Sequence, residues 1–242
     1  MPRNAKAYIA LIIASGTTVL LLAAGSWPSG SLRQFAIYLG LAAIASTLKI
    51  RIPRIEGTMS PNFIFLLLGI TFCRFSEVAA ISLAASLVQS LWAAKQPRLI
   101  QVTFSAATLI LSASIAFQAS HLLLGRIAGE SPAVLVILAG SLYLPLNTAL
   151  VSTVIGLMEG QPIVKIARTC YECVFPYFMG GIVFAGLASG AFARSSMWRG
   201  AVALMPLVIL GYLYAVSRQP AIATQMQPIT PMEEKQLVEV GS

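Results

Sequence analysis

Charged residues are scarce in this chain, and aspartate is missing altogether. Only 10% of its 242 residues are charged, whereas a soluble domain carries about 25%. Its eight acidic residues are all glutamates, and His121 is the single histidine. A Ser-His-Asp arrangement for hydrolysis is therefore excluded, and no G-x-x-x-x-G-K phosphate loop occurs. These absences favour a protein that is not an enzyme.

Apolar residues are abundant instead. They make up 57% of the chain, and the mean hydropathy is +0.83. Sixteen lysines and arginines leave a net charge of +8, which suits loops that face anionic lipid headgroups. No basic cluster with interleaved aromatic residues is present to hold a nucleic acid backbone. We therefore expect the lipid bilayer, and no nucleic acid, among the partners.

Cysteine is also rare, with Cys73, Cys170 and Cys173 as its only representatives. Three cysteines in apolar settings do not indicate a disulfide framework. Cys170 and Cys173 form a C-x-x-C, which is typical of a redox pair or of half a zinc site. The predicted topology puts Cys73 and His121 across the bilayer from this pair. We therefore expect no metal and no cofactor, and redox chemistry at the pair stays open.

Long apolar runs predict the fold class. A helix needs about 20 apolar residues to cross a hydrocarbon core of about 30 Å. The chain is expected to be an all-α polytopic transmembrane helical bundle with about eight spans, of which the third is the shortest. The runs lie near residues 7–25, 33–49, 58–73, 77–94, 100–124, 132–157, 174–193 and 200–217.

The distribution of basic residues predicts the orientation, because cytoplasmic loops collect lysine and arginine. With both termini inside, eleven basic residues are cytoplasmic and five are external. We expect residues 1–218 to form the transmembrane domain of a multi-pass inner-membrane protein, and residues 219–242 a flexible cytoplasmic tail. The cytoplasmic set is Arg3, Lys6, Lys49, Arg51, Arg54, Lys95, Arg98, Lys165, Arg168, Arg218 and Lys235; the external set is Arg33, Arg74, Arg126, Arg194 and Arg199.

Two segments resemble one another. Residues 49–63 and 165–178 each read as a basic cytoplasmic loop with one glutamate, followed by a proline and an aromatic residue at a helix entrance. This pattern is compatible with two parallel four-helix halves. Glu56 and Glu172 each have a basic neighbour, Arg54 and Arg168, which favours solvated ion pairs at the membrane interface.

Polar residues within the spans mark a candidate site. The fourth span carries Ser82, Ser86 and Gln89 on one face, and the fifth carries Gln101, Ser105, Thr108 and Ser112 at the same helical spacing. Folding this hairpin back brings the two stripes together, either as hydrogen bonds between helices or as the lining of a pocket. The residues that we expect to contact a small neutral ligand are Ser60, Asn62, Gln89, Gln101 and Asn147.

The sixth and seventh spans carry helix-distorting and helix-packing signals. Pro145 and Asn147 lie in the middle of the sixth span, where a proline frees a backbone carbonyl, so either a broken helix at a site or a simple kink is indicated. In the seventh span, Gly181 and the Gly186-x-x-x-Gly190 pattern favour close helix packing.

The segments IPRIEGTMSPNFIFLLLGI, ISLAASLVQSLW and SLYLPLNTALVSTVIGLMEGQPIVKIARTCYECVFPYFMGGIVFAGL carry a family resemblance. The chain resembles the multi-spanning membrane input regions of bacterial cyclic-dinucleotide signalling proteins. The first segment is also similar to the S components of energy-coupling-factor vitamin transporters. The resemblance covers roughly residues 45–190 and implies a small ligand held between helices. Unlike the signalling proteins, the sequence shows no output domain after Arg218, and its eight expected spans exceed the number usual for S components.

The first hypothesis is therefore a non-enzymatic membrane protein that senses a small neutral ligand and acts through a protein partner or a second copy. A small-molecule transporter, or its substrate-binding subunit, is the alternative. A scaffold or accessory subunit of a membrane complex also fits the small-residue helix faces and needs no ligand.

Overall fold

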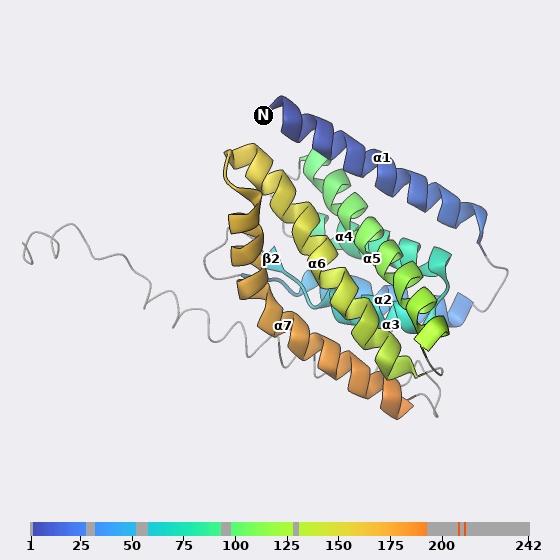
Figure 1. The fold of residues 1–242 in the computed structure, drawn as a ribbon. Coiled ribbons are helices and arrows are strands. Elements are labelled where there is room, and N and C mark those ends of the chain that lie inside the picture. Colours follow the sequence, from blue (N-terminus) through green and yellow to red (C-terminus); the bar gives the residue numbers. More distant parts are fainter. Residues whose placement is uncertain are drawn as a thin grey trace, which may run out of the picture.

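The computed structural model describes residues 2–27, 32–51, 58–92, 98–127, 131–192 and the single positions 208 and 211. This part of the chain forms seven helices and one ladder of two-residue strands (Figure 1). The elements are α1 Arg3–Gly25, α2 Leu32–Thr47, β1 Ile50–Arg51, β2 Thr58–Met59, α3 Asn62–Phe72, α4 Phe75–Leu91, α5 Leu99–Ile127, α6 Pro132–Glu159 and α7 Ile163–Phe192.

The predicted helical class is confirmed. In a helix the backbone N–H and C=O groups pair with one another, which is required in lipid because lipid tails offer no hydrogen-bond partners. Among the described residues, four helices are long and apolar enough to cross a membrane, and α2, α3 and α4 are shorter apolar helices. The four long segments are Arg3–Gly25, Leu99–Leu124, Pro132–Glu159 and Ile163–Gly190.

Successive helices run in alternating directions, so the bundle has two distinct ends (Figure 1). We call the end with the start of α1, the β1–β2 hairpin and the start of α7 the hairpin end. In the hairpin, Ile50 pairs with Met59 and Arg51 with Thr58 in antiparallel register. The Tyr8 hydroxyl donates to the Leu150 carbonyl at 3.1 Å, which joins the first turns of α1 to the last turns of α6.

Helix α3 forms the centre of the bundle. Every residue from Asn62 to Ile70 is buried, because α2, α4, α5, α6 and α7 all contact this short helix. A helix that is apolar on all sides requires such surroundings. Its 11 residues span only about 17 Å, well short of a hydrocarbon core. The run predicted near 58–73 is shortened because its first residues form strand β2 and a turn.

Helix α1 packs on the outside of the bundle. Its buried residues Ile9 and Ile12 join a small apolar cluster with Phe104 and Ala107 of α5, separate from the main core. Gly16 permits a close approach, since a Cβ built there would lie 2.7 Å from both Cα and Cβ of Ala107. The main core contains no residue of α1.

The connection between α6 and α7 corrects a prediction. The segment that starts at Lys165 was expected to be a loop, but it is helical from Ile163 onward. Gly160 ends α6 with a φ of 67°, a left-handed conformation that glycine adopts without strain, and Pro162 directly precedes α7. The whole turn therefore fits into three residues, and the basic segment is free to continue the helix.

Helix α7 changes direction along its length (Figure 1). Pro176 lies inside it and removes the backbone hydrogen bond to the carbonyl of Glu172, which is a common cause of kinks. The predicted span at 174–193 corresponds to the second half of this helix.

The structural repeat is not confirmed. Residues 50–59 contain two short strands, whereas residues 165–178 belong to one helix. The run expected at 200–217, apart from positions 208 and 211, and the expected tail at 219–242 lie outside the described residues.

Candidate functional site

A polar cluster joins three helices at the hairpin end. Asn62, the first residue of α3, donates through Nδ2 to Ser46 Oγ of α2 at 3.0 Å and to Gln89 Oε1 of α4 at 3.1 Å. The Ser46 hydroxyl in turn donates to the carbonyl of Ala42 at 2.8 Å. Asn62 is 6% exposed, and Gln89 is half-buried. Two of the predicted site residues, Asn62 and Gln89, are therefore in direct contact.

Several hydrogen-bonding groups of this cluster remain free. Ser60 is 3% exposed, and its hydroxyl has no partner in the described part of the chain. The α3 N-terminus adds backbone donors, because the first N–H groups of a helix lack partners within it, and Pro61 makes no side-chain cap. The cluster thus offers donors and acceptors from neutral groups.

Aromatic side chains pack on the side of α3 that faces α7, starting one residue after Asn62. Phe63, which follows Asn62, stacks on Phe178 of α7 with ring centroids 4.0 Å apart and lies 5.7 Å from the ring of Tyr177. Tyr143 of α6 stacks on the same Phe178 at 6.0 Å. Phe63 and Phe178 are buried, so the side of α3 that faces α7 is apolar and aromatic, whereas the Asn62 side chain bonds to α2 and α4.

Asn147 lies one turn beyond Tyr143 on the same face of α6, since residues four apart share a helix face. Its Oδ1 is buried and has no partner among the described residues. Helix α6 is continuous through Pro145, so the structure does not show a broken helix here. Pro145 itself is exposed.

Gln101 is not part of the cluster. It is exposed on the first turn of α5, and the structure does not bring it to Gln89. The rest of the two predicted stripes is largely buried between helices. Ser82 and Thr108 bond to carbonyls of their own helices, whereas the hydroxyls of Ser86 and Ser112 have no partner in the described residues.

Sequence reasoning missed Ser46 and the buried Tyr38. Ser46 follows an apolar run near the end of α2, and nothing in the sequence relates it to Asn62. Tyr38 is fully buried, with its hydroxyl unpaired in the described structure. A tyrosine in an apolar run would be a usable signal, because a buried tyrosine normally finds a partner for its hydroxyl.

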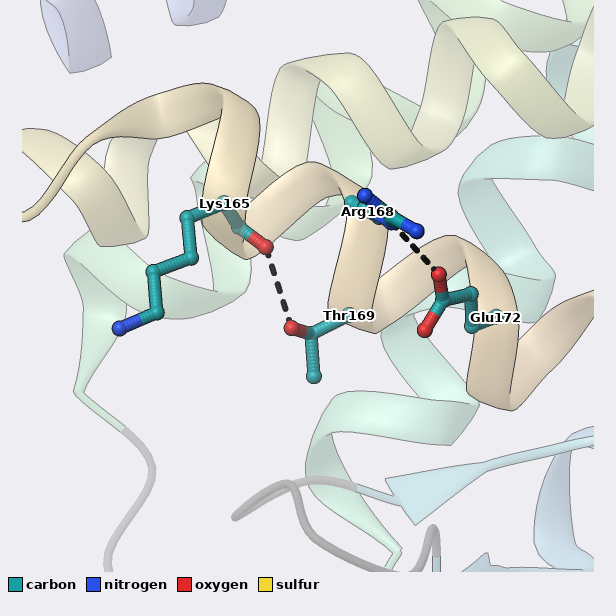
Figure 2. A network of polar contacts seen from close by, with 4 residues as sticks. All are labelled: Lys165, Arg168, Thr169 and Glu172. Carbon is teal, nitrogen blue, oxygen red and sulfur yellow. Dashed lines mark hydrogen bonds and ion pairs between the residues drawn. The ribbon is translucent and has the colours of Figure 1, made fainter.

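The charged residues of α7 lie outside the cluster. Arg168 Nε donates to Glu172 Oε1 at 2.7 Å, one turn apart, and both side chains are exposed (Figure 2). The ion pair predicted for Glu172 is confirmed, while the one predicted for Glu56 lies outside the described residues. His121 is exposed and stacks on Phe117.

The structure describes no metal-binding group of three or more histidine, cysteine or acidic residues in the part of the chain that it covers. Cys170 and Cys173 are free and half-buried on α7, and Cys73 is free and buried between α3 and α4.

We expect a soluble maleimide to label Cys170 and Cys173 in the folded protein but not Cys73. The reagent must reach the thiol, and Cys73 is only 8% exposed, whereas Cys170 and Cys173 are half-buried. Serine at positions 170 and 173 should abolish native labelling and leave the fold unchanged. Mass spectrometry counts the adducts, and denatured protein, which should take three, is the control. Native labelling of Cys73 would contradict the described packing.

The candidate site is thus a cluster of Ser46, Ser60, Asn62 and Gln89 at the start of α3, and the structure shows no contact of Asn147 with it. None of these side chains ionises, so the chemistry they offer is hydrogen bonding to a neutral molecule. Comparisons with protein-family models, with curated proteins and with solved structures find no match for this chain.

Proposed function

We propose that this chain is a non-enzymatic, multi-pass membrane protein that senses a small neutral ligand at the start of α3 and acts through a partner. The hydrogen-bond network of Asn62 with Ser46 and Gln89 carries the proposal, together with the unpaired hydroxyl of Ser60. Buried polar groups normally find partners, so the free Ser60 hydroxyl, two residues before Asn62, suits a ligand. The resemblance to membrane input regions of signalling proteins points the same way.

The proposed topology counts eight spans, including the short α3 that is buried within the bundle, with both termini in the cytoplasm of a bacterial inner membrane. Its support is the distribution of basic residues, which favours the hairpin end as the cytoplasmic end. That end holds Arg3, Lys6, Lys49, Arg98, Lys165 and Arg168, whereas the opposite end holds Arg33 and Arg74.

Cysteines placed at Ser131 and at Gln161 should react with an impermeant thiol reagent from opposite sides of the membrane. These positions flank α6, which is about 42 Å long and can span a bilayer. The measurement is labelling of intact cells against inverted vesicles, in protein with serine at positions 170 and 173. Reaction of both cysteines from one side would overturn the topology.

Leucine at Asn62 should weaken ligand binding about five- to 150-fold, because a buried hydrogen bond to the ligand is lost. Stability should fall by only about 1 kcal/mol, since each bond between membrane helices contributes about 0.6 kcal/mol. Native mass spectrometry from gentle detergent would detect a retained small molecule. Thermal shifts with the molecule so identified would then measure its binding to each variant.

Gln101→Leu is the matched control, because Gln101 is exposed and outside the cluster. It should retain wild-type binding. Equal retention of the molecule by the Asn62→Leu protein would remove the proposed site. Detection of no bound molecule, with a co-purifying subunit, would favour the scaffold alternative, and uptake of the molecule into vesicles would favour the transporter.

A further inference from the structure

The first half of α7, residues 163–175, has a surface that neither the bundle nor the candidate site explains. The exposed charged and polar side chains Lys165, Thr169 and Glu172 follow one stripe at helical spacing, with Arg168 beside them (Figure 2). On the side of the helix that faces the bundle, the side chains are half-buried and include Cys170 and Cys173.

Large apolar side chains occupy the adjoining exposed stripe. Val164 is 80% exposed, and Tyr171 and Phe175 follow it at spacings of seven and four residues, 37% and 38% exposed. The exposed surface of this segment therefore carries an apolar stripe and a polar stripe, with Arg168 at the boundary between them, one turn from Val164, Tyr171 and Glu172. Such a division is the pattern of a helix that lies at a boundary between lipid and water.

The dimensions of α7 support this position. Its 30 residues extend about 45 Å, against a hydrocarbon core of about 30 Å, so about a third of the helix exceeds one span. All its charged residues, Lys165, Arg168 and Glu172, lie in the first half. The kink at Pro176 separates that half from the apolar second half, which packs along α6 through Gly140 and Ile182.

Two other positions for the segment are unfavourable. In the hydrocarbon core, the three charged side chains would lose their hydration, at several kcal/mol or more in total. In water, Val164, Tyr171 and Phe175 would leave three large apolar side chains exposed on one side of the helix. Only the interface accommodates both stripes, and tyrosine is itself enriched there.

We propose that residues 163–175 form an interfacial helix that binds anionic lipid headgroups through Lys165 and Arg168. Arg3, Lys6, Lys49 and Arg98 lie at the same end of the bundle and give that surface a basic character. Glu172 pairs with Arg168 at 2.7 Å and so weakens the attraction for anions. The proposal requires membrane insertion of the bundle and is independent of the ligand site.

The test uses the full chain in vesicles, with serine at positions 170 and 173. One cysteine, introduced in place of Val164 or of the neighbouring Lys165, carries an environment-sensitive fluorophore, and the native Cys73 is buried. Acrylamide, a neutral quencher, should reach the probe at 165 but not the probe at 164. Equal quenching at both positions would overturn the proposal, because the segment would then lie in water, where its apolar side chains would need a protein partner to cover them. Equal protection at both would also overturn it, by placing the segment in the hydrocarbon core or beneath a second copy.

The lipid arm compares vesicles of phosphatidylcholine alone with vesicles that also contain phosphatidylglycerol. The probe stays at 164, and Lys165 or Arg168 is replaced by glutamate. In the anionic vesicles, each replacement should raise the ratio of quenched to protected probe at least about fivefold. Glu172→Gln should shift it in the opposite direction, and neutral vesicles should show neither effect. Identical behaviour of all variants in both lipids would overturn the role of anionic headgroups.

Discussion

Leucine in place of Gly181 is expected to destabilise the bundle by about 3 kcal/mol, at the upper end of the usual cost of overpacking a core. A Cβ at this position would collide with the Phe63 ring and approach Ile64 Cγ1 to 3.2 Å. The ring cannot move freely, because Phe63 is 2% exposed and stacks on Phe178. The higher helix propensity of leucine offsets only about 1 kcal/mol of this cost.

Gly180 provides the matched control in the same turn of α7. A Cβ there meets nothing within 4 Å, so Gly180→Leu should be neutral or slightly stabilising. Unfolding of both variants in the same detergent, followed by circular dichroism and by the fluorescence of a thiol-reactive dye, measures the difference. Equal stabilities would show that α7 does not approach α3 as closely as described. Loss of the retained small molecule only in Gly181→Leu would further connect this contact to the candidate site.

Leucine at Gly16 is expected to separate α1 from the rest of the bundle. The added Cβ would lie 2.7 Å from Ala107 Cα, and a backbone atom cannot rotate away as a side chain can. We expect the substitution to weaken the packing of α1 on α5 by about 3 kcal/mol. The main core should survive, because none of its residues belongs to α1.

Spin labels at the exposed positions Leu22 and Ile115 would report the distance between α1 and α5. In Gly16→Leu this distance should lengthen and broaden, while the Asn62 network stays intact. Gly25→Leu, in the same helix and with nothing within 4 Å, should leave the distance distribution unchanged. An unchanged distribution in Gly16→Leu would mean that α1 is held mainly by other contacts, such as that of Tyr8 with Leu150.

The candidate site was only partly predictable. Ser60, Asn62 and Gln89 were identified because polar residues are rare in apolar runs, and a rare polar group in a buried segment needs a partner. Gln101 met the same criterion yet lies on the outside of α5, because the facing of a helix depends on its rotation within the bundle. Helical spacing defines which residues share a face, but not which way that face points.

The sequence by itself determined the helical class, the membrane-like composition and the approximate positions of most described helices, because these follow from length and hydropathy along the chain. It also indicated the Arg168–Glu172 pair, which is local. Only the tertiary structure decided that α3 is a short buried centre and that Ser46 meets Asn62. It also decided that the missing side chain of Gly181 leaves space for the Phe63 ring. These contacts join residues distant in sequence, and each depends on helix rotations and lengths that a hydropathy pattern does not encode.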